Sequence, residues 1–169
     1  KSGDQAAAIV QDLLTMTRRG VAVLEPVSLS NIIAEQLKTP EFHQFQRHHP
    51  GVAIVERLEP RLAPIKGSTP HLAKAIMNMI NNAAEAMAGG GSVRITTSNL
   101  SLETTIHGYE AVPPGDYAVV SIADEGTGIS AADISRIFEP FFTTKEMGRS
   151  GSGLGMAVVW GTVKDHNGY

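Results

Sequence analysis

The feature that most constrains this chain is a pair of glycine clusters between residues 124 and 155. The first, Asp124-Glu125-Gly126-Thr127-Gly128, follows an apolar strand pattern, and the second, Gly151-Ser152-Gly153-Leu154-Gly155, opens a helical pattern. Glycine allows backbone conformations closed to other residues and lets the main chain approach a ligand closely. A helix that begins behind such a loop offers free N–H groups and a positive dipole end to phosphate. The two clusters therefore predict a nucleotide held between the Asp124 carboxylate and the second glycine loop.

Length, charge and cysteine content exclude several classes of protein. The 169 residues suffice for one domain with a full core and at most a short appendage. A formal net charge of −3 argues against a large basic surface, so no nucleic-acid partner is expected. The absence of cysteine excludes disulfides and thiolate metal sites and fits a reducing, cytoplasmic location for this domain. No apolar run approaches the ~20 residues that span a bilayer, although the parent protein could still be soluble or attached to the inner membrane.

The N-terminal segment predicts a helix over residues 4–19, because its apolar residues follow the spacing of one helical face. Arg18-Arg19-Gly20 provides a basic, glycine-terminated end. The apolar stripe needs a partner: it either packs on this chain's own domain or is the end of a coiled-coil or bundle hairpin, which we prefer. Residues 1–20 would then end a hairpin helix, residues 21–26 form a linker and residues 27–169 a second domain. Since the chain begins at Lys1 without an initiator Met or a secretory pattern, we expect it to be cut from a longer protein.

Short helices and strands are expected between residues 27 and 66. They are a strand over 27–29, a helix capped by Ser30 and running to Lys38, a helix over 41–48, a strand over 52–58 and a weaker strand over 62–66. The Arg47-His48-His49 cluster does not predict a metal site, because adjacent histidines do not share a face of a helix or strand. A solvated turn is expected there instead.

The most informative element is a helix from Thr69 to Met87, with Thr69 as N-cap, Pro70 as first residue and glycines as the stop. At 100° per residue its apolar side chains fall in one arc about 100° wide; they are Leu72, Ile76, Met79, Ile80, Ala83 and Met87. Asn78, Asn82 and Glu85 fall together in a neighbouring arc about 60° wide. This helix alone does not decide whether the polar arc is a helix surface without a function or part of a binding site.

The remaining pattern leads to the glycine clusters. A strand over 92–102 is followed by a hairpin connection and a strand over 116–123 that ends at Asp124. Ser130 is expected to cap a helix over 131–137, and the last helix covers 152–166. Residues 143–152 are small, polar and glycine-rich, with Lys145 among them, and predict a mobile lid.

Four segments occur in order between residues 70 and 166: Asn78 to Ala86, Asp124-x-Gly126-x-Gly128-Ile129, Phe138-Glu139-Pro140-Phe141-Phe142-Thr143-Thr144-Lys145, and Gly151-x-Gly153-Leu154-Gly155-Met156. They resemble the N, G1, F and G2 boxes of the ATP-binding domain shared by gyrase B, the heat-shock-90 chaperones, sensor histidine kinases and MutL. The third box and the short lid resemble histidine kinases specifically. The first helix is similar to the end of the dimerisation hairpin that precedes such domains.

The resemblance implies an α/β fold, a two-layer sandwich in which helices cover one face of a mixed sheet. The family's final strands would follow Tyr169, so we expect the catalytic domain to be incomplete at its C-terminus. ATP and Mg²⁺ would lie between the long helix and the lid. Asn82 would coordinate Mg²⁺, with Asn78 and Glu85 beside it, because an amide oxygen is a hard, neutral ligand.

The resemblance also implies a role for each glycine cluster. Asp124 would accept a hydrogen bond from the adenine amino group, and a carboxylate, which only accepts, favours adenine over guanine there. The other implied nucleotide-binding residues would shape the turn beneath the base or bring N–H groups and the Lys145 charge to the phosphates; they are Gly126, Gly128, Ile129, Thr144, Lys145, Gly151, Ser152, Gly153, Leu154 and Gly155.

The implied function is transfer of the γ-phosphoryl group of ATP to a histidine on the dimerisation domain of a homodimer, with a response regulator receiver domain as a further partner. The family's phosphoacceptor histidine lies in a His-Glu or His-Asp sequence, and none of the six histidines here has that setting. Two alternatives remain. An ATPase clamp is disfavoured, because Asn78 stands where its catalytic Glu is expected. A binding module could hold a nucleotide or a partner without transfer.

Overall fold

The computed structural model describes residues 24–144 and 152–169. The helix expected over 4–19 and most of the expected lid, including Lys145 and Gly151, lie outside the described residues. The elements, in chain order, are β1 Glu25–Val27, α2 Leu29–Gln36, α3 Pro40–His48, β2 Val52–Arg57, β3 Ile65–Gly67, α4 Thr69–Glu85, β4 Gly91–Leu102, β5 Ile106–His107, β6 Ala111–Val112, β7 Gly115–Ala123, α5 Ala131–Ile134 and α6 Gly155–Asp165. None of the described helices is long and apolar enough to cross a membrane.

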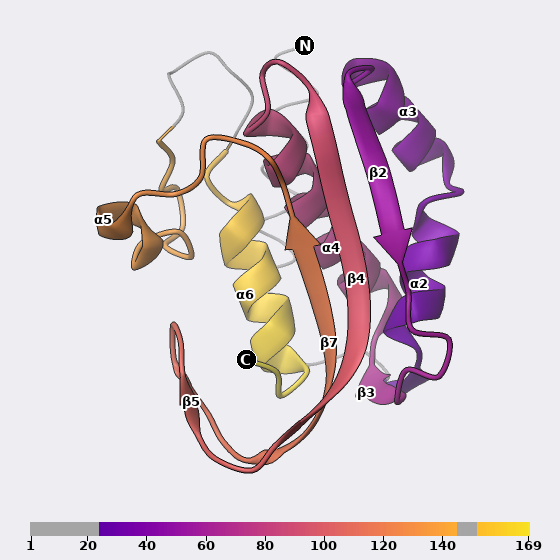
Figure 1. The fold of residues 1–169 in the computed structure, drawn as a ribbon, viewed down its shortest axis with the longest axis vertical. Coiled ribbons are helices and arrows are strands. Elements are labelled where there is room, and N and C mark those ends of the chain that lie inside the picture. The colour runs from indigo at the N-terminus through magenta and orange to yellow at the C-terminus, as the bar shows by residue number, and fades with distance from the viewer. Residues whose placement is uncertain (1–23, 145–151) are drawn as a thin grey trace.

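The main sheet has three strands in the order β2-β4-β7, shown face-on in Figure 1. β2 runs parallel to β4, with Ile54 opposite Val93. β4 runs antiparallel to β7, with Ile95 opposite Ile122. The sheet is therefore mixed, as expected, and the connection between β4 and β7 is the expected hairpin. β1 and β3 form a separate antiparallel pair at one end of the molecule.

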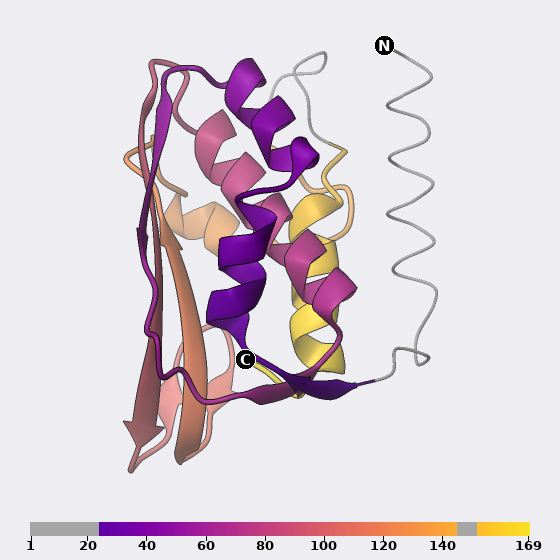
Figure 2. The same ribbon diagram turned by 90° about the vertical axis from the view of Figure 1, so that its right-hand side faces the viewer.

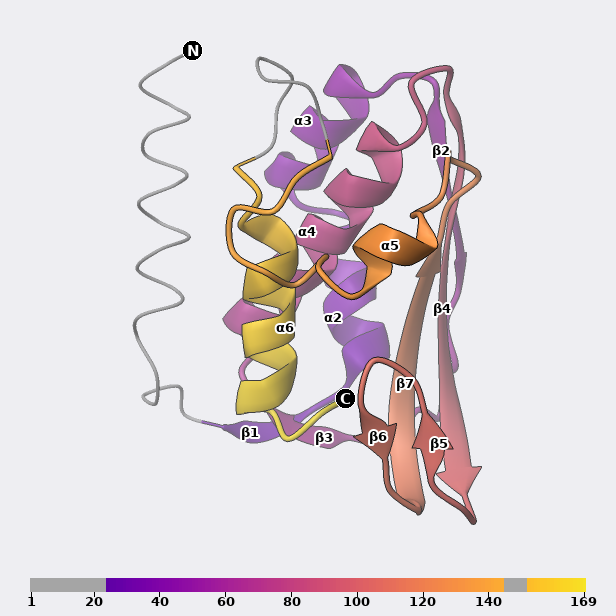
Figure 3. The same ribbon diagram turned by 90° about the vertical axis from the view of Figure 1, so that its left-hand side faces the viewer.

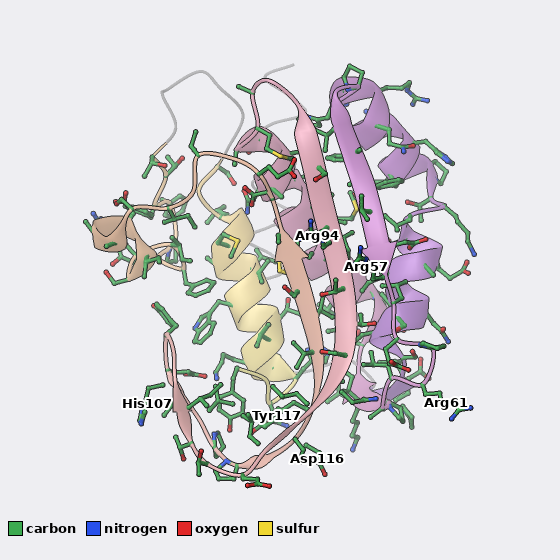
Figure 4. All side chains as sticks on the ribbon, in the orientation of Figure 1. Arg57, Arg61, Arg94, His107, Asp116 and Tyr117 are labelled. Carbon is green, nitrogen blue, oxygen red and sulfur yellow. The ribbon has the colours of Figure 1, made fainter. Side chains whose placement is uncertain are left out.

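Helices cover one face of the sheet, so the expected two-layer arrangement is confirmed (Figure 2). Along β4, Val93, Ile95 and Thr97 are buried against the helices, because alternate side chains of a strand point to opposite faces. Arg94, between the first two, is exposed on the other face, as is Arg57 of β2 (Figure 4). The apolar side chains thus meet the helices, while polar ones occupy the open face.

Helix α4 lies at the centre of the helical layer. Its buried side chains contact the sheet and α2 on one side, and α6 packs along another side (Figure 3). Ile76 and Ile80 are almost fully buried, at 3% and 0% exposure. Burying side chains of this size stabilises the fold by roughly 1.5–3 kcal/mol each. This packing fixes how the polar flank of α4 is oriented.

The β5–β6 hairpin curves toward α6, and its tip carries an aromatic contact that the sequence did not suggest (Figure 3). The ring of Tyr109 lies 4.7 Å from that of Phe138 and 5.0 Å from that of Trp160 on α6. Beside it, Lys164 of α6 forms an ion pair with Glu110. The hairpin tip therefore contacts both the segment around Phe138 and helix α6.

Several expected boundaries are wrong by a few residues. The first strand is Glu25–Val27 rather than 27–29, and Ser28 caps α2, its hydroxyl accepting from the Asn31 N–H. Ser30 does not cap, because its side chain is buried and donates to the Glu59 carbonyl. Ser68 rather than Thr69 is the N-cap of α4. α5 ends at Ile134 and α6 begins only at Gly155, so both are shorter than expected, while the weak strand is Ile65–Gly67 instead of 62–66.

Thr97 is the one polar side chain in the buried row of β4, and its hydroxyl is fully used. It accepts from the Glu59 N–H at 2.7 Å and shares a 2.9 Å hydrogen bond with Ser30. Substituting Thr97→Val keeps the side-chain shape but leaves the Glu59 N–H unpaired. We expect a loss of about 1–3 kcal/mol in unfolding free energy, measured by urea denaturation. The control Thr96→Val, on the open face, should change it by less than about 0.5 kcal/mol; equal losses would contradict this interpretation.

Candidate functional site

The polar flank of α4 meets the beginning of α6. Asn78, Asn82 and Glu85 are all half-buried. The Asn78 side-chain amide donates to the Gly155 carbonyl at 3.4 Å, a long hydrogen bond. A Cβ placed on Gly155 would lie 3.7 Å from the Asn82 Nδ2 and 3.9 Å from the Asn78 Cγ. The two asparagines therefore lie against the N-terminus of α6.

Within the described residues, the first backbone N–H groups of α6 have no hydrogen-bond acceptor. Leu154 is its N-cap residue and provides no side-chain hydrogen bond to the first turn. Its own N–H donates to the Ser152 hydroxyl at 3.2 Å. The first N–H groups of an α-helix have no intrahelical acceptor, and they carry the positive end of the helix dipole. The asparagine side chains and the uncapped N-terminus of α6 together suit an anion.

The loop before α6 is held by the segment that follows Phe138. Gly153 has φ +67°, and a Cβ there would lie 2.6 Å from the Phe141 carbonyl carbon. The Phe141 N–H donates to the Gly153 carbonyl at 2.9 Å, and Phe141 itself has φ 66°. A side chain at position 153 would push the two loops apart. The close approach observed at Gly153 is therefore to the Phe141 backbone, whereas the sequence predicted an approach to a ligand.

The first glycine cluster forms a turn that contacts the C-terminal end of α4. A Cβ on Gly126 would lie 2.7 Å from both the Cβ and the carbonyl oxygen of Ala86, the C-cap residue of α4. One oxygen of Asp124, Oδ1, accepts from the Gly126 N–H at 2.9 Å. The other, Oδ2, makes no hydrogen bond within the described residues. Asp124 is exposed, so this oxygen is available to a ligand.

The next residue, Glu125, was not singled out in the sequence. Its Oε2 accepts from the Ser92 N–H at the start of β4 at 2.9 Å. This hydrogen bond, together with the charge of Arg94, holds the pKa of the Glu125 carboxyl below its ordinary value. The sequence does show a second carboxylate directly after Asp124, and this could have drawn attention to Glu125. It does not show which backbone N–H this carboxylate would accept.

The remaining residues proposed from the sequence are less enclosed. Gly128 has φ +72°, with nothing within 4 Å of an added Cβ, so its conformation rather than crowding favours glycine. Ile129 is 57% exposed, and Thr144 is exposed too. Lys145 and Gly151 cannot be compared with the structure, since they lie outside the described residues.

Two cavities border α4 on the side of α3. One of about 400 Å³ is lined by His48, His49 and Glu85 among others, and one of about 270 Å³ includes Asn78 and Asn81. Within residues 24–144 and 152–169, no group of three or more His, Asp or Glu side chains could hold a metal ion. His48 is exposed and His49 half-buried.

The oxygen donors on α4 fit a hard cation that shares its ligands with a phosphate. Mg²⁺ keeps several waters and uses one or two protein oxygens plus substrate phosphates, so it needs no cluster of carboxylates. Asn78 and Asn82 place amide groups beside the start of α6, and Glu85 follows them on α4 with a carboxylate. The donor set therefore fits Mg²⁺ carried by a nucleotide.

Comparison with known proteins agrees with this geometry. Residues 67–169 match the family described as histidine kinase-, DNA gyrase B-, and HSP90-like ATPase. The chain is 32% identical over 173 residues to the sensor kinase CckA of Brucella abortus, covering 100% of this chain and 18% of that protein. It is 34% identical over 166 residues to the sensory histidine kinase/phosphatase NtrB of Rhodobacter capsulatus, covering 90% of this chain and 45% of that protein. The chain thus spans less than half the length of these relatives.

A solved structure extends the likeness to the fold. Full-length ShkA in complex with AMPPNP superposes with a TM-score of 0.68 at 25% identity, covering 97% of this chain and 32% of that chain. AMPPNP is an ATP analogue, and it is bound there to a protein that shares this arrangement of helices and strands.

The contact between the Gly126 turn and Ala86 leaves no room for a side chain. Substituting Gly126→Ala should lower the unfolding free energy by about 1–3 kcal/mol, because a methyl group would displace the turn from α4. Gly161→Ala is the control, since Gly161 is exposed in α6 with nothing within 4 Å of an added Cβ. That variant should be neutral or more stable by up to about 1 kcal/mol. Thermal or urea unfolding that finds Gly126→Ala as stable as Gly161→Ala would contradict the contact.

Proposed function

The chain belongs to the histidine kinase-, DNA gyrase B-, and HSP90-like ATPase family, and we propose that it is the ATP-binding catalytic domain of a sensor histidine kinase. We propose that this domain lies in the cytoplasm. The observation that carries this proposal is that α4 contacts both glycine loops. Its C-terminal end contacts the Gly126 turn, and its polar flank contacts the start of α6 at Gly155. A nucleotide lying along α4 would reach both.

The base and the phosphates of a nucleotide differ in chemistry, and so do the Asp124 turn and the start of α6. The exposed Oδ2 of Asp124 accepts hydrogen bonds only, which suits the amino group of adenine. Gly126, Gly128 and Ile129 would border the base. The N-terminus of α6 suits the phosphates, because the N–H groups of a first helical turn and the helix dipole attract negative charge. Thr144, Lys145, Gly151, Ser152, Gly153 and Leu154 are proposed to complete the phosphate side.

Asn82 is the proposed Mg²⁺ ligand on the protein, with Asn78 and Glu85 beside it. When bound, Mg²⁺ would neutralise part of the negative charge of the phosphates. The protein's own contribution is orientation. The packing of Ile76 and Ile80 fixes α4 against the sheet, so its polar flank cannot rotate away from the start of α6.

The proposed reaction is phosphoryl transfer from ATP to a histidine on the dimerisation domain of the parent homodimer. The bond between the γ-phosphorus and its bridging oxygen breaks, ADP leaves, and a ring nitrogen of the histidine forms the new bond to phosphorus. Such a reaction depends on positioning and charge stabilisation more than on a strong base in this domain. A response regulator receiver domain would then take the phosphoryl group from the histidine.

The ATPase clamp is the weaker alternative. It needs a carboxylate to activate water one turn before Asn82, where this chain has Asn78, whose amide bonds the Gly155 carbonyl instead. A binding module that holds ATP without transfer is the second alternative, and it predicts binding without a labelled histidine.

Asp124→Asn should weaken ATP binding by about tenfold to a hundredfold, measured by titration calorimetry. The amide oxygen can still accept from the Gly126 N–H, but an NH₂ group would then face the amino group of adenine. Asp116→Asn, at the opposite end of β7 and also exposed, is the matched control and should leave the affinity unchanged (Figure 4). Equal affinities in the two variants would exclude Asp124 as the adenine ligand.

Autophosphorylation of the full-length protein tests the function itself. With ATP labelled at the γ-phosphate, the wild type should acquire an acid-labile label on histidine. Asn82→Ala should reduce this label more than tenfold, because it removes the proposed Mg²⁺ ligand. Asn81→Ala is the control and should retain the label, because residue 81 points about 100° around the helix from Asn82. Tight ATP binding by the wild type without any labelled histidine would favour the binding module.

A further inference from the structure

Glu125 occupies the point at which the chain leaves the sheet. β7 pairs with β4 as far as Ala123, which lies opposite Arg94. If the antiparallel ladder continued, Glu125 would lie opposite Ser92, and backbone groups would pair there. The main chain turns toward α4 instead, and the Glu125 side chain accepts the Ser92 N–H at 2.9 Å. A carboxylate thus replaces a backbone acceptor where the strand ends.

The contact between Glu125 and Ser92 is exposed, and the main chain lies close to its neighbours on two sides of it. A Cβ on Gly91, which has φ +149°, would lie 2.8 Å from the Met87 sulfur and 3.4 Å from the Glu125 Oε2. On the other side of the turn, Gly126 lies against Ala86. The turn is therefore fixed at two successive residues, to β4 through Glu125 and to α4 through Gly126.

We propose that Glu125 is a positioning residue for base recognition: its hydrogen bond to Ser92 fixes the turn that directs the free oxygen of Asp124 toward the adenine amino group. The inference rests on the proposed function, in which Asp124 binds adenine. Glu125 itself does not contact the nucleotide. Its Oε2 accepts the Ser92 N–H at the start of β4, and the positive charge of Arg94 stabilises its ionised form.

The charge state of Glu125 suits this role. The Ser92 N–H, with a smaller contribution from Arg94, lowers the pKa of the carboxyl in the folded protein. A depressed pKa means that the interaction is fully present above the carboxyl's pKa in the unfolded chain and weakens as the pH falls through its folded value. The hydrogen bond therefore persists throughout the neutral range in which kinase assays are run.

A comparison of ATP with ITP separates positioning from a general structural role. ITP carries a carbonyl oxygen where ATP carries the amino group, so it cannot donate to Asp124. In the full-length protein, Glu125→Ala should weaken ATP binding by about tenfold while changing ITP binding by less than about twofold. A variant that only destabilises the fold would weaken both nucleotides alike.

Two further variants keep the test decisive if Glu125→Ala folds poorly. Glu125→Gln retains an oxygen that can accept the Ser92 N–H and should restore most of the preference for ATP over ITP. Glu125→Asp is shorter by one methylene and should resemble the alanine variant. Glu103→Ala removes an exposed carboxylate just after β4 and serves as the charge control, with no change in either affinity.

The outcomes are distinct. Equal losses for ATP and ITP, or unchanged ATP affinity in Glu125→Ala and Glu125→Asp, would overturn the positioning role while leaving the proposed function intact. If the wild type binds neither nucleotide, the proposed function fails and the inference fails with it.

Discussion

The contact between the Gly126 turn and the C-terminal end of α4 is the constraint on which the site depends. Because glycine has no Cβ, the turn lies directly against Ala86, where a methyl group would come within 2.7 Å of two of its atoms. The same helix carries Asn78 and Asn82 against the start of α6. One rigid element therefore sets the spacing between the two loops, and its own position follows from burial against the sheet.

The electrostatics of the proposed site divide along this helix. At one end the Asp124 carboxylate keeps an oxygen exposed, while the adjacent Glu125 is occupied by the Ser92 N–H. At the second position, beside Asn78 and Asn82 earlier along α4, α6 begins without a side-chain cap. A group that donates hydrogen bonds suits the first end, and an anion suits the second. Adenosine triphosphate has this polarity, and for this reason we propose that it lies with its base at Asp124 and its phosphates at α6.

Much of this arrangement could be predicted from the sequence, because the signals were local. Alternating apolar residues predicted β4 and β7, and the three-and-four spacing predicted α4 with its polar flank. Side-chain hydrogen bonds between distant segments could not be predicted. Ser30 was expected to cap a helix but is bonded to Glu59, 29 residues away, and Tyr109 packs on Trp160 through a hairpin whose direction no local pattern specifies. Glu125 was missed for the same reason.

Hydrogen exchange with two ligands tests the central claim most directly, because it separates the base from the phosphates. Adenosine should slow amide exchange in the turn around Gly126 and leave the first turn of α6 unchanged. Mg-ATP should slow exchange in both, including the N–H groups of Gly155 and its neighbours. Protection of α6 by adenosine alone, or no protection at either segment by Mg-ATP, would contradict a nucleotide lying along α4 between the two glycine loops.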